Sequence, residues 1–227
     1  MSKKAAKKPK KQDQFENVEQ VLSASEAFIE KYQKEILYGL GAIAVLIMAF
    51  LAINNYVIKP RATEAANEMY KAQQYFARDS FQLALQGDDF EAIGFEAISS
   101  KYSLTTSGNL AKAYAGICYY NLGEYEEAIR FLSSYDGNDN YFAPSVTGLI
   151  GDCYVELDES SKAVRYFSKA AASGNEIVAP IFLKKAGIAL ESMGDTKKAL
   201  KNYLEIKERY PLSQEAQDID KYITRLQ

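Results

Sequence analysis

Four signals recur along the chain with a period of 35 or 36 residues, and this repetition limits the possible folds more than any other feature. A glycine leads each copy, a turn-forming residue follows seven positions later, an alanine after twelve and a large apolar residue after sixteen. These positions are Gly116, Gly123, Ala128 and Leu132; Gly151, Asp158, Ala163 and Phe167; and Gly187, Gly194, Ala199 and Tyr203. Such a period is the signature of stacked helical hairpins.

The four signals have separate physical roles in a helix–turn–helix unit. The glycine and the alanine are expected to face each other, because small residues let two antiparallel helices approach closely. The large residue is expected to fill the space between one hairpin and the next. Gly123 and Gly194 can adopt the left-handed backbone that ends a first helix, and Asp158 can do so less readily.

The run from Gly116 to Ala128 resembles the tetratricopeptide repeat in nearly consensus form. A second copy contains Gly151-Asp-Cys-Tyr154, and a third begins at Gly187 with leucine where the family usually has tyrosine. The resemblance implies an all-α fold, a solenoid of helical hairpins. It also implies that the first helices line a concave surface.

A degenerate fourth copy is expected upstream of these three. Four residues, namely Phe95, Ile98, Tyr102 and Leu104, precede Tyr203, Ile206, Tyr210 and Leu212 by three periods of 36. We expect this copy to contain a long helix near residues 61–86 and another near 89–101, without the glycine–alanine pair. The domain at 59–227 then divides into a hairpin at 61–104, repeats at about 109–143, 144–179 and 180–212, and a capping helix at 213–227.

The capping helix is predicted from its own pattern. Ser213 can cap its start. The residues Ile219, Tyr222, Ile223 and Leu226 then form an apolar stripe at helical spacing. A solenoid needs such a terminal element, because its last repeat otherwise exposes an apolar face.

The stretch from Ile36 to Ile58 contains no charged residue. As a helix it would extend about 35 Å at 1.5 Å per residue, enough to cross a hydrocarbon core about 30 Å thick. A buried core helix and a cleaved signal peptide are the alternatives. The stretch is longer than a signal-peptide core and follows 35 mostly polar residues. We therefore predict a transmembrane helix at 36–58 that ends at Lys59-Pro60.

Residues 1–35 are predicted to be cytoplasmic, so that the C-terminal domain is extracytoplasmic. Six lysines lie among the first eleven residues, and such tails stay in the cytoplasm. Phe15, Val18, Leu22, Ile29, Tyr32 and Ile36 are spaced as in an amphipathic juxtamembrane helix. That helix is either a simple extension of the anchor or a docking helix for a membrane partner.

Composition argues against an enzyme. The chain has no histidine, which removes the commonest general base and metal ligand, and it shows no glycine-rich phosphate loop. Cys118 and Cys153 occupy equivalent places in adjacent repeats, where core thiols are favoured over a disulfide. The 17 tyrosines fall mostly at apolar helix positions and are assigned to packing. We expect no catalytic, cofactor or metal site, no nucleic acid and no small-molecule substrate.

Helical position assigns seven residues to the concave surface, where a protein partner would bind. They are Ile117, Tyr120, Asp152, Val155, Lys184, Ile188 and Glu191. The carboxylate clamp of chaperone-binding relatives requires a cluster of basic residues and asparagine. Ala113, Ile117, Gly148 and Asp152 do not supply it. An apolar segment or a partner helix is therefore the expected ligand.

The whole arrangement resembles the ancillary subunit family of the bacterial SecYEG translocon, which joins a single inner-membrane helix to a periplasmic tetratricopeptide domain. The resemblance implies an adaptor that links SecYEG with a membrane-anchored, prolyl-isomerase-like chaperone and assists emerging secreted proteins. The alternative is a scaffold of another secretion or assembly complex of the cell envelope.

Overall fold

The computed structural model describes residues 31–88, 90 and 92–227, and the regular structure of these residues is entirely helical. The chain divides into two compact units, residues 1–57 and 58–227. This confirms the predicted all-α class. Most of the predicted juxtamembrane helix lies outside the described residues.

The first unit contains helix α2, Gln33–Ile53, and most of a π-helical stretch at Asn54–Ile58. No residue of α2 is buried. A core helix of a soluble domain would bury at least one face, and α2 buries none against the described residues. A long, fully exposed apolar helix is present, as the sequence predicts.

The prediction that Lys59-Pro60 ends this helix is wrong. Helical structure extends from Gln33 to Phe76 and passes through the proline. Pro60 is the second residue of α3, Lys59–Phe76, and follows directly on the π-helical stretch. A proline is tolerated where the regular i→i−4 hydrogen bonding has already been interrupted, because its missing N–H removes no further bond there.

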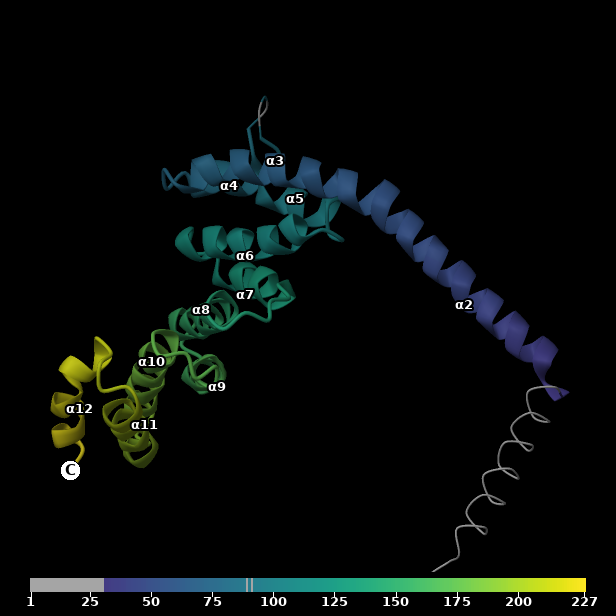
Figure 1. Ribbon diagram of the computed structural model, residues 1–227. Helices are drawn as coiled ribbons and strands as arrows, with labels where there is room; N and C mark the ends of the chain where they lie inside the picture. The colour runs from purple at the N-terminus through teal and green to yellow at the C-terminus, as the bar shows by residue number, and fades with distance from the viewer. Residues whose placement is uncertain (1–30, 89, 91) are drawn as a thin grey trace, which may run out of the picture. The chain divides into compact units, whose positions relative to one another are not determined.

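Three helical hairpins form the middle and C-terminal parts of the second unit and follow one another in chain order (Figure 1). The first consists of α6, Thr106–Asn121, and α7, Tyr125–Ser134. The second consists of α8, Phe142–Glu156, and α9, Ser160–Ala171. The third consists of α10, Val178–Ser192, and α11, Thr196–Arg209.

The turn inside each hairpin is built in the same way. Gly123, Asp158 and Gly194 all have positive φ, at 80°, 57° and 80°. In the first turn Gly123 N donates to Tyr120 O and Glu124 N donates to Tyr119 O. The other two turns have the same pair of bonds. This Schellman geometry satisfies the last carbonyls of each first helix and confirms the predicted role of these three residues.

The leading glycines do pack closely, and the side chain nearest to each is the large residue rather than the predicted alanine. A methyl group placed on Gly116, Gly151 or Gly187 would lie 2.3–2.6 Å from the side chain of the large residue sixteen positions later. Those side chains are Leu132, Phe167 and Tyr203. The alanines Ala128, Ala163 and Ala199 are fully buried beside them. The large side chain thus lies between the two helices of its own hairpin as well as near the next.

The fourth copy is less degenerate than predicted. The helix expected near 61–86 is broken by Asp79, whose φ is 57° and whose turn has the same Schellman bonds. Ala72 and Ala84 flank this turn at the same twelve-residue spacing and are fully buried. They replace the glycine–alanine pair that the sequence analysis considered missing.

The second helix of this copy is split into α4, Phe81–Gln86, and α5, Gly94–Lys101. The turn at Asp79 precedes the next one at Gly123 by 44 residues, whereas the later turns are 35 and 36 residues apart. The connection 87–93 supplies seven of these eight or nine extra residues. Because this insertion has no counterpart in the other repeats, the repeat pattern alone could not place it.

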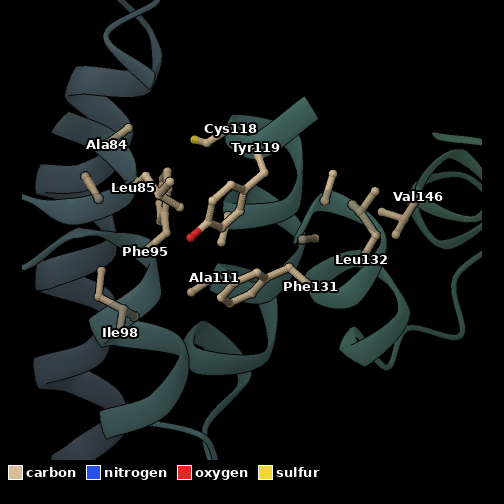
Figure 2. Packing of buried hydrophobic residues seen from close by; sticks show 14 of the residues in the cluster. Ala84, Leu85, Phe95, Ile98, Ala111, Cys118, Tyr119, Phe131, Leu132 and Val146 are labelled. Carbon is tan, nitrogen blue, oxygen red and sulfur yellow. The ribbon is translucent and has the colours of Figure 1, made fainter. Parts of the chain in front are cut away.

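The interior consists of two clusters of buried apolar side chains, one between Ala65 and Cys153 and one between Ala163 and Ile223. Figure 2 shows part of the first cluster. Tyr119 of α6 and Phe131 of α7 stack with ring centroids 5.3 Å apart. Cys118 and Cys153 are free thiols with no exposed surface, and burial raises the pKa of each to about 12. The prediction that they are core residues is confirmed.

The chain ends in a short 3-10 turn, Glu215–Gln217, and helix α12, Ile219–Arg225. The Ser213 Oγ accepts a hydrogen bond from Ala216 N at 3.2 Å, so it caps the 3-10 turn rather than α12. Ile219 and Ile223 are buried with the core of α10 and α11, and Tyr222 and Leu226 pack beside them. The apolar stripe therefore covers the end of the solenoid as predicted.

Candidate interaction surface

The seven predicted partner-binding residues lie on the three first helices of the hairpins. Ile117 and Tyr120 are on α6, Asp152 and Val155 on α8, and Lys184, Ile188 and Glu191 on α10. We call the surface that they form the first-helix face. All seven are at least partly exposed. Two groups can be distinguished by what their side chains contact.

One group forms an apolar strip, which consists of Val155 and Ile188 with Ile117 and Tyr120. Lys185 Nζ lies 2.8 and 2.7 Å from the two carboxylate oxygens of Asp152, which fixes the register between α8 and α10. Val155 and Ile188 each follow this pair by three residues and are therefore at matching levels of the two helices. Their side chains are 44% and 46% exposed. Ile117 and Tyr120, on α6, are half-buried at the edge of the core.

The other group pairs with the C-terminal segment. Lys184 Nζ forms a 2.6 Å ion pair with Asp218. Glu191 accepts hydrogen bonds from Tyr203 Oη at 2.6 Å and from Arg225 at 2.7 Å. Lys184 and Glu191 thus connect α10 to the capping segment, and their role as partner-binding residues stays a prediction.

The carboxylates of the face differ in their electrostatic setting. Burial raises the pKa of Asp152, and its pairing with Lys185 only partly offsets this. Burial also acts to raise the pKa of Glu191, but the hydrogen bonds from Tyr203 and Arg225 outweigh it and the pKa is lowered. The hydrogen bond from Lys184 lowers the pKa of Asp218. The charges of this face are thus matched within the protein.

The structure gives a steric reason why the first-helix face cannot form the carboxylate clamp. Ala113 is fully buried. A methyl group on Gly148 would lie 1.9 Å from the ring of Phe182, so no longer side chain fits at that position. Ile117 is apolar and Asp152 already binds Lys185. Recognition of an acidic tail by a basic cluster is therefore not available at these positions.

Three functional partners were not identified from the sequence: Lys185, Asp218 and Arg225. They pair with Asp152, Lys184 and Glu191 at separations of 33 or 34 residues. These separations are close to the repeat period. A search for opposite charges about one period apart would therefore have identified the three partners. The prediction of the capping helix used only its apolar stripe and did not consider its charged side chains.

Among the described residues, no group of three or more cysteine, aspartate or glutamate side chains is arranged to hold a metal ion. The buried tyrosines are used in packing and in bonds to carboxylates. Tyr119 Oη donates to Glu96 at 2.6 Å, just as Tyr203 Oη donates to Glu191. Their geometry is that of interhelical contacts.

The second unit is thus a helical-repeat solenoid, a class that acts through protein binding. The family model of the tetratricopeptide repeat matches residues 114–135 and 183–213, which cover parts of the first and third hairpins. The chain contains tetratricopeptide repeats, and the repeat pattern read from the sequence is confirmed.

Solved structures support the same fold. The chain is similar to a protein of Podosopora anserina described as a kinesin light chain with nearly identical TPR-like repeats. Two structures of it share 11% identity with the chain, cover 73% of it and 85% or 86% of their own length, and give TM-scores of 0.55 and 0.54. No curated protein matches the chain significantly. The likeness therefore establishes the helical-repeat architecture alone.

Proposed function

We propose that the protein is a non-enzymatic, membrane-anchored interaction scaffold. The observation that carries the anchor is the exposure of α2: large hydrophobic side chains from Ile36 to Ile53 are between 39% and 75% exposed. Such a surface is unfavourable in water and favourable in a hydrocarbon core. The interaction role follows from the repeat fold, which presents a surface to proteins.

The partner site is the apolar strip of the first-helix face. Val155 and Ile188 lie at matching levels of α8 and α10 and are nearly half exposed, while Asp152 and Lys185 near them are paired with each other. A partner that presents apolar side chains in a row can bury this strip without leaving a charge unpaired. An amphipathic helix meets that requirement.

The finer assignment is to the bacterial inner membrane, with the N-terminus in the cytoplasm and the repeats in the periplasm. There the protein would act as an ancillary translocon subunit that links SecYEG and a membrane-anchored, prolyl-isomerase-like chaperone. The support for this assignment is the layout of the chain: a lysine-rich tail, one apolar span and a repeat domain.

Affinity purification of the tagged full-length chain in mild detergent tests the assignment. We expect translocon and chaperone subunits to co-purify. The double variant Val155→Glu/Ile188→Glu should lose them at least tenfold, because two carboxylates would then lie in the apolar strip. Leu83→Glu is the matched control, since Leu83 is 42% exposed on α4, outside the face.

Three outcomes would contradict parts of the proposal. Recovery of a different envelope complex would replace the translocon assignment and leave the scaffold role standing. Unchanged recovery with the double variant would show that the apolar strip is not the partner site. Extraction of the chain from membranes by alkaline carbonate would exclude the anchor.

A further inference from the structure

A second apolar surface lies at the far end of the solenoid, away from the first-helix face residues on α6. Leu212 is 98% exposed and Ile177 is 62% exposed. Leu212 precedes the capping segment and Ile177 precedes α10. Both side chains therefore stand at the start of a helix, on neighbouring repeats.

Both side chains are exposed although hydrogen bonds fix the backbone around them. Ser213 N donates to Tyr210 O at 3.0 Å, and Ser213 Oγ accepts from Ala216 N, so the turn around Leu212 is closed on both sides. Asn175 Oδ1 accepts hydrogen bonds from Ile177 N at 2.8 Å and from Val178 N at 3.0 Å. These bonds hold both apolar side chains in water, where their exposure is unfavourable unless something covers them.

The two side chains line a cavity of about 390 Å³. Ile181, Tyr210 and Pro211 complete its apolar lining. Ligand pockets have volumes of about 300–1,000 Å³, so this one is small. It accommodates one or two apolar side chains of a peptide rather than the face of a whole helix.

The rim of the cavity is acidic. Glu176 and Glu215 line it, and neither forms an ion pair within the described part of the chain. Arg209 also lines it, but its guanidinium is paired with Glu205 on the same helix. The charge left for a partner is that of two carboxylates, which attract basic groups and repel acidic ones.

We propose that this cavity, which we call the Leu212 pocket, is a peptide-docking site that takes an apolar side chain flanked by lysine or arginine. The apolar side chain fills the space between Ile177 and Leu212. The flanking basic groups lie against Glu176 and Glu215. The site is separate from the apolar strip, and it does not depend on the membrane anchor.

Three synthetic hexapeptides test the proposal against the full-length chain in lipid nanodiscs. Each has two central residues flanked on both sides by two others: leucines flanked by lysines, leucines flanked by glutamates, and serines flanked by lysines. By fluorescence anisotropy we expect the lysine–leucine peptide to bind at least tenfold more tightly than either of the others. Added salt should weaken its binding.

Variants locate the binding. Ile177→Ser/Leu212→Ser should weaken the lysine–leucine peptide at least tenfold, whereas Leu104→Ser should not. Leu104 is the matched control because it is a 75% exposed leucine just before α6. Glu176→Lys/Glu215→Lys should reverse the preference toward the glutamate–leucine peptide. Both pairs of positions are at the surface, and circular dichroism verifies that each variant is folded.

The proposal is overturned by any of three results. The first is that the wild-type chain binds none of the peptides at millimolar concentration. The second is that the Ile177→Ser/Leu212→Ser variant binds as tightly as wild type, and the third is that the charge-reversed variant keeps the original preference. The first two would show that the pocket is not a docking site, and the third that its rim does not select charge.

Discussion

At the turn inside each hairpin one residue must adopt a left-handed backbone, and the second hairpin places aspartate there. Asp158 has φ of 57°, where its neighbours Gly123 and Gly194 have 80°. The left-handed conformation costs a non-glycine residue roughly 1–2 kcal/mol. We therefore expect Asp158→Gly to stabilise the domain by about 0.5–1 kcal/mol, measured by urea unfolding followed by circular dichroism.

The reverse substitution provides the control for this backbone argument. A methyl group at Gly194 would contact nothing within 4 Å, so packing does not oppose it. Gly194→Ala should nevertheless destabilise the domain by about 1 kcal/mol, because alanine would be held at positive φ. Equal stability of wild type, Asp158→Gly and Gly194→Ala would show that the turns carry no strain.

Gly187 presents a different constraint, because space rather than φ requires a glycine. A methyl group there would lie 2.3 Å from the Tyr203 ring, which is fully buried and tied by its hydroxyl to Glu191. Overpacking of this kind typically costs 1–3 kcal/mol. Gly187→Ala should lower stability by about that amount in thermal unfolding, whereas Ser192→Ala on the exposed side of α10 should not. A loss below about 0.5 kcal/mol would mean that Tyr203 can move.

The sequence predicted which residues are special but not always what they touch. The period identified Gly187, Ala199 and Tyr203 correctly, because their spacing is fixed by helix geometry. It paired the glycine with the alanine instead of the tyrosine, because the crossing of two helices decides which side chain lies over the gap. Lys185 was missed for a related reason: its partner Asp152 lies one repeat away.

Among the elements, α12 has the most distinctive pH dependence. The hydrogen bonds from Tyr203 and Arg225 lower the pKa of Glu191. The hydrogen bond from Lys184 lowers the pKa of Asp218. A carboxyl whose pKa falls on folding stabilises the folded state above its unfolded pKa, 4.5 for Glu191 and 3.8 for Asp218, and loses this contribution as the pH falls further. Asp152 on α8 has a raised pKa and the opposite sign, but Asp139, which caps the start of α8, has a lowered pKa, so α8 is not a neutral reference.

We therefore expect the cap to loosen first when the pH falls below about 4, near the ordinary pKa of a carboxyl group. Hydrogen exchange, corrected for the intrinsic rate at each pH, should become severalfold faster in 219–225 than in 106–121, a helix capped by the uncharged Thr105. At neutral pH, Asp218→Asn with Glu191→Gln should reproduce the effect. Asp220→Asn is the control on the same helix, because its pair with Lys207 is exposed and contributes little. Uniform exchange across the repeats at low pH would contradict the prediction that the bonds of Glu191 and Asp218 make the cap loosen first.

The elements that sequence reasoning missed share a cause. Asp79 ends α3 without the glycine or proline that usually signals such a break. Pro60 produces no break, because the π-helical stretch before it had already altered the hydrogen bonding. In both cases the hydrogen bonding of the neighbouring backbone sets the local conformation, and residue types alone do not reveal it. Where a residue type has a strong intrinsic preference, as in the glycine turns, the prediction was confirmed.

At the scale of the whole molecule, the repeat fold and the apolar helix support different parts of the functional proposal. The repeat fold suggests that the protein binds other proteins, and we propose the exposed apolar strip and the Leu212 pocket as the places where it does so. The uncharged helix, not the fold, is the reason to expect a membrane, and the lysine-rich tail is the reason to expect an orientation. Each part of the functional proposal can therefore fail without the others.

The orientation of the chain across the membrane can be tested directly with inverted vesicles. If the tail stays in the cytoplasm, inverted inner-membrane vesicles enclose the repeat domain and expose residues 1–35. Added protease should then shorten the chain only by its tail, and digest the domain once detergent opens the vesicles. Leu46→Arg places a charge near the middle of the span at a cost of about 2.5–3.5 kcal/mol, so it should reduce the protected fraction. Complete digestion of the domain in sealed vesicles would reverse the orientation, whereas a chain absent from the vesicles would exclude the anchor itself.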